Sequence, residues 1–240
     1  MHTIYILTRL TLAEAARRKI VWIAAILGVL FLAVFAYGYH LIRSSYLHET
    51  LEANDYILTE MGGFFALAGL YAVNFLTTIM TIIASVDTLA GEIHSGTMQT
   101  LVTKPVQRWQ ILVGKWLGYL LMMTLYLGLM AGGVLLAMRW IGNYAIPNAP
   151  SGVGLMWLSS ATLLCLSFLG GTFLSTLPNG VMALGLYGVA FVGGWVEQIG
   201  ALFGSQAAIN IGILSSFIVP SEALWRRASY EMQPSTGGFM

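Results

Sequence analysis

Five long apolar runs constrain this chain more than any other feature of its sequence. The first, residues 20–42, contains no Lys, Arg, Asp or Glu. About 20 such residues, coiled as a helix, cross the roughly 30 Å hydrocarbon core of a bilayer, and a helix satisfies its own backbone hydrogen bonds there. We therefore predict an all-α polytopic membrane protein with five transmembrane helices, at residues 20–42, 62–86, 110–138, 153–177 and 181–197.

Composition excludes an ordinary soluble domain. Hydrophobic residues make up 58% of the chain and charged residues 9%, whereas soluble domains carry about 25% charged residues. We treat residues 1–240 as one transmembrane domain. The single cysteine, Cys165, excludes an intrachain disulfide. A three-residue turn, Pro178 to Gly180, separates the last two predicted spans.

The placement of Lys and Arg predicts a cytoplasmic N-terminus. Basic residues gather in the cytoplasmic loops of membrane proteins. With the N-terminus inside, the cytoplasmic basic residues are Arg9, Arg17, Arg18, Lys19, Lys104, Arg108 and Lys115, and the outer ones are Arg43, Arg139, Arg226 and Arg227. The larger cytoplasmic group favours this orientation, so residues 87–109 form a cytoplasmic loop.

Residues 1–19 precede the first span, and their pattern predicts an amphipathic helix. Ile6, Leu10 and Ala13 share one helical face, while basic side chains turn elsewhere. Such a helix lies along the inner leaflet, with its basic end at anionic headgroups. The alternative is a disordered basic flank.

The loop of residues 87–109 interrupts the apolar pattern with a break and a short second helix. The second span can continue as a helix to Glu92 or His94, until Gly96 ends it. A short helix then begins at Thr97, and Pro105 stops it. A short helix is thus presented to the cytoplasm between two long spans.

Three side chains give this short helix an apolar face. Met98, Leu101 and Val102 recur at helical spacing. Such a face suits docking into a groove of a soluble partner. The alternative, which periodicity does not separate from the first, is that the three side chains rest in the lipid interface.

The same loop resembles the cytoplasmic signature of ABC-2 type transporter permeases, the membrane subunits of type V ABC exporters. The resemblance rests on these residues in this order: Glu92, Gly96, Thr97, Pro105, Arg108, Gly114 and Lys115. It extends to the N-terminal helix, the five span positions and the outer segment ending at residues 220–226. One departure is Gln107, which stands where such permeases often carry a small hydroxyl residue able to cap the next helix.

The resemblance implies a coupling function for the loop. It identifies Glu92, Gly96, Thr97, Met98, Leu101, Val102, Pro105 and Arg108 as the ATPase-coupling interface. It implies a cytoplasmic ABC ATPase subunit as partner, which binds the ATP and Mg²⁺, and a second permease copy or a paralogue across a dimeric seam. It also implies a multi-pass protein of the cell membrane, surrounded by lipid, with no nucleic-acid partner.

Catalytic motifs are missing from the sequence. No G-x-x-x-x-G-K-[ST] loop is present to bind a nucleotide, and the four histidines are too scattered for a metal site. We therefore expect no enzyme activity, no catalytic or metal residues and no cofactor in this chain. The predicted function is the permease subunit of an ATP-driven ABC exporter. The alternative is a non-transporting membrane anchor or tethering subunit.

Residues 198–240 follow the fifth span, and we predict an outer re-entrant segment and tail there. Polar residues interrupt the apolar stretch 199–219, and stretches of this kind more often re-enter the membrane than cross it. In the alternative, residues 199–219 form a sixth span. The family resemblance leads us to expect a sixth span that this sequence does not contain.

Glu197 is a further candidate for a functional residue, and two glycine pairs are candidates for helix packing. Glu197 ends the fifth span and is a candidate outer gate or partner for a substrate cation, the alternative being a solvated helix end. The two glycine pairs at four-residue spacing allow close helix packing or arise by chance: Gly114 with Gly118, and Gly128 with Gly132.

The predicted orientation can be tested by labelling. We expect single cysteines at Asn54 and Gly96, introduced after Cys165→Ala, to react with an impermeant maleimide from opposite sides of intact cells. Position 54 should label from outside, because it lies between the first two spans. Labelling of both positions from outside would refute the orientation.

Overall fold

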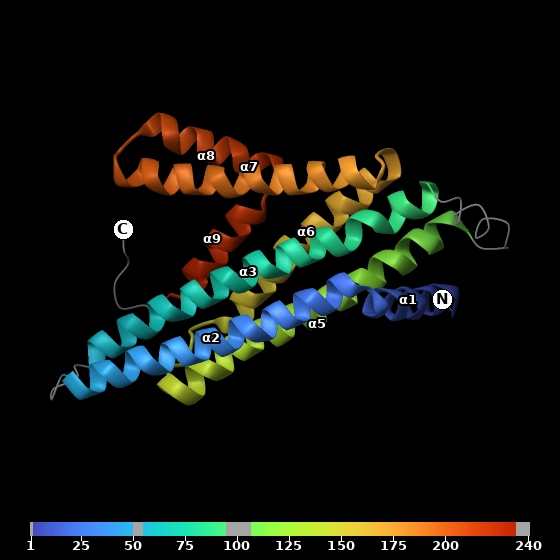
Figure 1. Ribbon diagram of the computed structural model, residues 1–240. Coiled ribbons are helices and arrows are strands. Elements are labelled where there is room, and N and C mark those ends of the chain that lie inside the picture. Colours follow the sequence, from blue (N-terminus) through green and yellow to red (C-terminus); the bar gives the residue numbers. More distant parts are fainter. Residues whose placement is uncertain (1, 50–54, 95–106, 234–240) are drawn as a thin grey trace.

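The computed structural model describes residues 2–49, 55–94 and 107–233, and all the regular secondary structure in these ranges is helical. Figure 1 shows long helices lying side by side, with α1 beside one end of α5. The helices are α1 (His2–Arg17), α2 (Lys19–Glu49), α3 (Asp55–His94), α5 (Arg108–Gly142), α6 (Ala149–Phe173), α7 (Thr176–Leu202), α8 (Gln206–Ile218) and α9 (Ser221–Glu231).

Five of these helices are long and apolar enough to cross a membrane: α2, α3, α5, α6 and α7. They confirm the predicted all-α polytopic fold. α3 continues to His94, as the sequence predicted.

The boundary between the last two spans was predicted wrongly. α6 ends at Phe173 and α7 begins at Thr176, with Ser175 as its N-cap residue. Pro178 therefore lies in the first turn of α7 and not in a turn between helices. Proline fits there, because the first backbone N–H groups of a helix have no partner inside the helix.

The helix α1 packs against α5 through two glycines. A Cβ atom at Gly114 would lie 2.6 Å from the Cβ of Leu7, and one at Gly118 would lie 2.7 Å from the Cβ of Thr11. Thr8 also donates a 3.1 Å hydrogen bond to the carbonyl of Gly114. Glycine is thus what allows the two helices to approach so closely.

Another face of α1 is exposed. It carries Ile6 and Leu10, which are free to face lipid as the amphipathic pattern predicted.

The second glycine pair makes no close contact of this kind. At Gly128 and Gly132, no atom of the described residues would lie within 4 Å of an added Cβ. The packing hypothesis is therefore confirmed for the first glycine pair, whereas the described part of the chain gives the second no close contact.

α3 is the central helix of the bundle. It packs against α2, α5, α6, α7 and α9. Its 40 residues make it about 60 Å long at 1.5 Å per residue, about twice the hydrocarbon thickness. Burial follows this arrangement. In the most apolar 18-residue stretch of each helix, 56% of α3 is buried within the protein, against 6% of α2.

One face of α3 is polar and lies in the protein interior. Its buried polar residues recur at helical spacing: Asn74, Thr77, Thr78, Thr81, Ser85 and Thr88. Ser85 donates a 2.8 Å hydrogen bond to Ser167 of α6, and Thr81 donates one of 2.7 Å to the carbonyl of Thr77. Lipid offers no hydrogen bonds, so a polar face of this kind points into the bundle.

The C-terminal helices form a bent pair that folds back on the bundle. α8 runs antiparallel along α7, where Gly193 meets Ser215 and Gly200 meets Ala208 (Figure 1). The angle between α8 and α9 is 107°, which is the geometry of a broken span or a re-entrant loop. A break at residues 203–205 means that 199–219 is not one continuous helix. We refer to α8 and α9 as the outer hairpin, after the side of the membrane that the sequence predicts for them.

The close contact between α1 and α5 at Gly118 can be tested with a matched pair of variants. We expect Gly118→Val to destabilise the protein by about 1–3 kcal/mol, the usual cost of overpacking, because its Cβ would clash with Thr11. Gly128→Val makes the same substitution on the same helix in open space. Thermal unfolding in detergent compares the two variants. Equal melting temperatures would show that the close approach of α1 and α5 does not depend on glycine.

Candidate functional site

Most of the predicted coupling interface lies outside the described residues. This holds for Gly96, Thr97, Met98, Leu101, Val102 and Pro105. The structure describes the two helices that hold the loop 95–106, namely α3, which ends at His94, and α5, which begins at Arg108. The candidate site is therefore built from the polar residues around the base of this loop.

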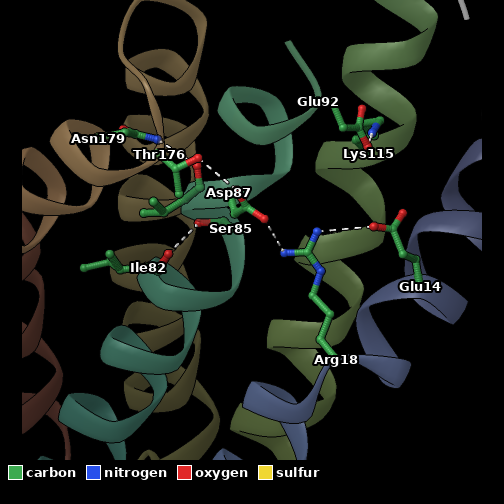
Figure 2. A network of polar contacts seen from close by, with 10 residues as sticks. Glu14, Arg18, Ile82, Ser85, Asp87, Glu92, Lys115, Thr176 and Asn179 are labelled. Carbon is green, nitrogen blue, oxygen red and sulfur yellow. Dashed lines mark hydrogen bonds and ion pairs between the residues drawn. The ribbon is translucent and has the colours of Figure 1, made fainter. Parts of the chain in front are cut away.

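The last turns of α3 are joined to the start of α5 by an ion pair. The Nζ of Lys115 donates to the Oε1 of Glu92, and the pair is shown at the top of Figure 2. Only 7% of the Lys115 side chain and 18% of the Glu92 side chain are exposed. A buried charge is costly without a partner of opposite sign, so each residue fixes the position of the other.

A second set of contacts joins α1, α3 and α7. Arg18, at the junction of α1 and α2, lies 3.2 Å from the Oε1 of Glu14 and 3.5 Å from the Oδ2 of Asp87 on α3. Thr176, the first residue of α7, donates a 2.9 Å hydrogen bond to the Oδ1 of Asp87. Figure 2 shows Asp87 between these two partners. After the side of the membrane that the sequence predicts for them, we give the name inner polar network to these residues: Glu14, Arg18, Asp87, Glu92, Lys115 and Thr176.

Asn179 fastens the first turns of α7 to two neighbouring helices. Its Nδ2 donates hydrogen bonds of 3.2 Å to the carbonyl of Val86 and 3.0 Å to the carbonyl of Ser167. Its side chain is completely buried. A side chain that bridges two helix backbones in this way holds α7 to both α3 and α6.

The start of α5 lacks a side-chain cap, as the sequence predicted. Gln107 is the N-cap residue, and in the described part of the chain its side chain makes no capping hydrogen bond. Its Oε1 instead accepts a hydrogen bond of 2.5 Å from the Nε1 of Trp109. Arg108 and Trp109 are exposed, so both are available at the headgroup level.

At the other end of the bundle, Glu197 has a partner. Its carboxylate forms an ion pair with Arg226 of α9, and only 18% of its side chain is exposed. The alternative of a solvated helix end is therefore wrong. The role of Glu197 as an outer gate stays a prediction.

Sequence reasoning did not single out Arg18, Asp87 or Asn179 as site residues. For two of these three residues, the sequence did contain a signal. Asp87 is the only charged residue between Glu60 and Glu92, and Asn179 is a polar residue within an apolar run. Polar residues in such positions usually face a partner inside the bundle.

The fold and these contacts define a multi-pass helical membrane protein whose longest span is held by ion pairs at the end that precedes loop 95–106. The family described as ABC-2 family transporter protein matches residues 6–212, which is most of the chain. The chain therefore belongs to this family and is an ABC transporter permease, a membrane transport component that is not itself catalytic. No curated protein matches it.

The buried pair Glu92–Lys115 generates a double-mutant test. We expect Lys115→Met to lower the free energy of unfolding by about 3–5 kcal/mol, because it removes one side of the buried ion pair with Glu92. Adding Glu92→Gln should restore much of this loss. The measurement is chemical denaturation in detergent micelles.

The control for this test is the pair Arg227–Glu231 on α9, where 60% of the arginine side chain is exposed. Breaking that pair by Arg227→Gln should cost about 1 kcal/mol or less. Additive effects of the two substitutions at positions 92 and 115 would contradict a direct interaction.

Proposed function

We propose that this chain is the permease subunit of an ATP-driven ABC exporter in the cell membrane. In this proposal the N-terminus is cytoplasmic, and loop 95–106 rests on a cytoplasmic ABC ATPase, which binds ATP and Mg²⁺. The observation that carries the proposal is the family match over residues 6–212 together with the ion-paired helices that hold this loop. Loop 95–106 is the direct connection between α3 and α5.

The pair Glu92–Lys115 supports a coupling role for this loop. The two residues join the helices immediately next to the loop, one on each side. A displacement of the loop therefore moves α3 and α5 together, since separating them would break a buried ion pair. Both helices are long, with 40 and 35 residues, so a displacement at the inner end reaches the outer half of the bundle.

Asp87 extends the same connection to α1 and α7. It contacts Arg18 on one side and Thr176 on the other. The helix α7 continues to the outer end, where Glu197 pairs with Arg226 of the outer hairpin. We infer that closure of the ATPase is passed from loop 95–106 through α3 to α7, and that Glu197 acts as the outer gate.

The proposal includes a second permease copy or a paralogue. α2 supports it, because only 6% of the most apolar 18-residue stretch of this helix is buried within one chain. Large apolar side chains along α2 remain exposed, among them Trp22, Ile26 and Val34. Lipid covers such a face in an isolated subunit, and a partner subunit can replace the lipid when a dimeric seam forms.

The central experiment tests docking of the loop on the ATPase. We expect the double variant Met98→Asp, Leu101→Asp to lose most ATPase binding, because apolar anchors at the centre of an interface typically contribute several kcal/mol. Co-purification in detergent with the ATPase that the wild-type chain brings down measures the effect. Expression level and elution volume check that the spans still insert.

The matched control places the same two charges in the same loop, at the intervening positions Gln99→Asp and Thr100→Asp. These positions lie off the predicted apolar face of Met98, Leu101 and Val102. This control should retain binding. If the Met98, Leu101 variant binds normally, the loop is not the docking element. Failure of the wild-type chain to bring down any ATPase would favour the alternative of an anchor or tethering subunit.

A further inference from the structure

The outer hairpin buries a second carboxylate beside the Glu197–Arg226 pair. Glu222 lies in the first turn of α9 and is 4% exposed. It packs directly on α7, because a Cβ atom at Gly194 would lie 2.3 Å from its Cγ. Arg226 follows one helical turn later and pairs with Glu197. Two carboxylates and one guanidinium thus meet where α9 contacts α7.

The surrounding helices supply no second positive charge in the described part of the chain. The titratable groups that face Glu222 from α3 and α7 are the phenols of Tyr71 and Tyr187, which are neutral at physiological pH. α6 contributes Ser159, whose hydroxyl donates to the carbonyl of Ser221. α8 contains no charged residue. Arg227, on α9 itself, pairs with Glu231.

The cluster therefore carries one net negative charge when both carboxylates are ionised. Such a charge is costly in a buried site. Two further polar atoms, the Oε2 of Glu197 and the Nε of Arg226, are buried and have no hydrogen-bond partner among the described residues. The carboxylate oxygen is in need of a hydrogen-bond donor, and the guanidinium N–H is in need of an acceptor. A protonated carboxyl can donate a hydrogen bond, whereas an ionised carboxylate only accepts.

We propose that Glu222 is a proton-binding site, and that one proton taken up there neutralises the cluster of Glu197, Glu222 and Arg226 and keeps the outer hairpin seated on α7. Loss of that proton places two ionised carboxylates around one guanidinium and weakens the contact of α9 with α7.

The direction of the effect follows from proton linkage. α9 lies outside the five spanning helices, and burial raises the pKa of Glu222 from its ordinary 4.5 to about 7, with Arg226 opposing and Glu197 adding to the rise. As pH increases from 4.5 to about 7, the unfolded chain ionises this carboxyl while the folded protein keeps it neutral. The folded state therefore binds more protons, and its stability falls as pH rises through this window.

The experiment measures melting temperature against pH for the purified full chain in detergent. We expect the wild-type protein to lose several degrees of melting temperature as pH rises from 4.5 to about 7. Glu222→Gln mimics the neutral carboxyl and should remove this part of the pH dependence. Glu231→Gln, on the same helix but in the pair with the exposed Arg227, should behave like the wild-type protein.

A third variant separates the proposal from a general effect of substitution on α9. Glu197→Gln removes the competing carboxylate and leaves Arg226 to Glu222, so the pH dependence should shrink without a loss of stability at the high end of the window. Infrared spectra give a direct measurement that needs no variant to be stable. The C=O band of a protonated carboxylic acid should be present in the wild-type protein below about pH 7.

Three outcomes would overturn the proposal. One is a pH dependence that Glu222→Gln leaves unchanged. Another is a wild-type melting temperature that responds to Na⁺ or Ca²⁺ at fixed pH instead of to pH, since a metal ion would then be the bound cation. The third is the absence of the protonated-carboxyl band from the wild-type spectrum, which decides the question even if Glu222→Gln cannot be purified.

Discussion

The absence of water in the bilayer core is the constraint on which the rest of this structure depends. It requires the backbone to satisfy its own hydrogen bonds and turns polar side chains at membrane depth toward the protein interior. The polar face of α3 carries six buried polar side chains, and they cannot face lipid. α6 and α7 cover this face, with contacts such as Ser85 to Ser167 and Asn179 to the carbonyl of Val86. α3 therefore lies at the centre, and α2, which has few polar groups, lies at the edge.

Charged side chains gather at both ends of the bundle. At the end beside loop 95–106, Arg18 lies beside Glu14 and Asp87, and Lys115 pairs with Glu92. At the end of the outer hairpin, Glu197 pairs with Arg226, and Glu222 packs on α7. α7 connects the two ends, since it begins at Thr176 beside Asp87 and passes Glu197 near its last turns. α7 thus contacts both α3, which leads to the proposed coupling loop, and α9 of the outer hairpin.

Glycine decides how closely the helices approach, and its effect depends on the neighbour. Gly114 and Gly118 bring α1 against α5, and Gly194 leaves room for Glu222. Gly128 has the same spacing in the sequence as Gly118, yet it has open space around it in the described residues. A spacing of four residues therefore indicates which positions permit close packing, and the presence of a second helix decides whether packing occurs.

The sequence by itself determined the features that depend on local pattern. Apolar length identified the five spans, amphipathic periodicity identified α1, and the continuation of the second span to His94 followed from the glycine beyond it. The order of residues around Glu92 and Lys115 also led to the ABC-2 family. These properties are local because the bilayer acts on each segment separately.

Only the tertiary structure decided which distant residues meet. Asp87 and Thr176 are 89 positions apart, and Lys115 and Glu92 are 23 apart. Pro178 is typical of a turn in the sequence, although the first turn of a helix tolerates proline equally well. The sequence does not single out Glu222, because its burial against Gly194 depends on the bend between α8 and α9. Hydropathy describes the environment of a single segment, whereas the pairing of charges depends on how the segments pack against one another.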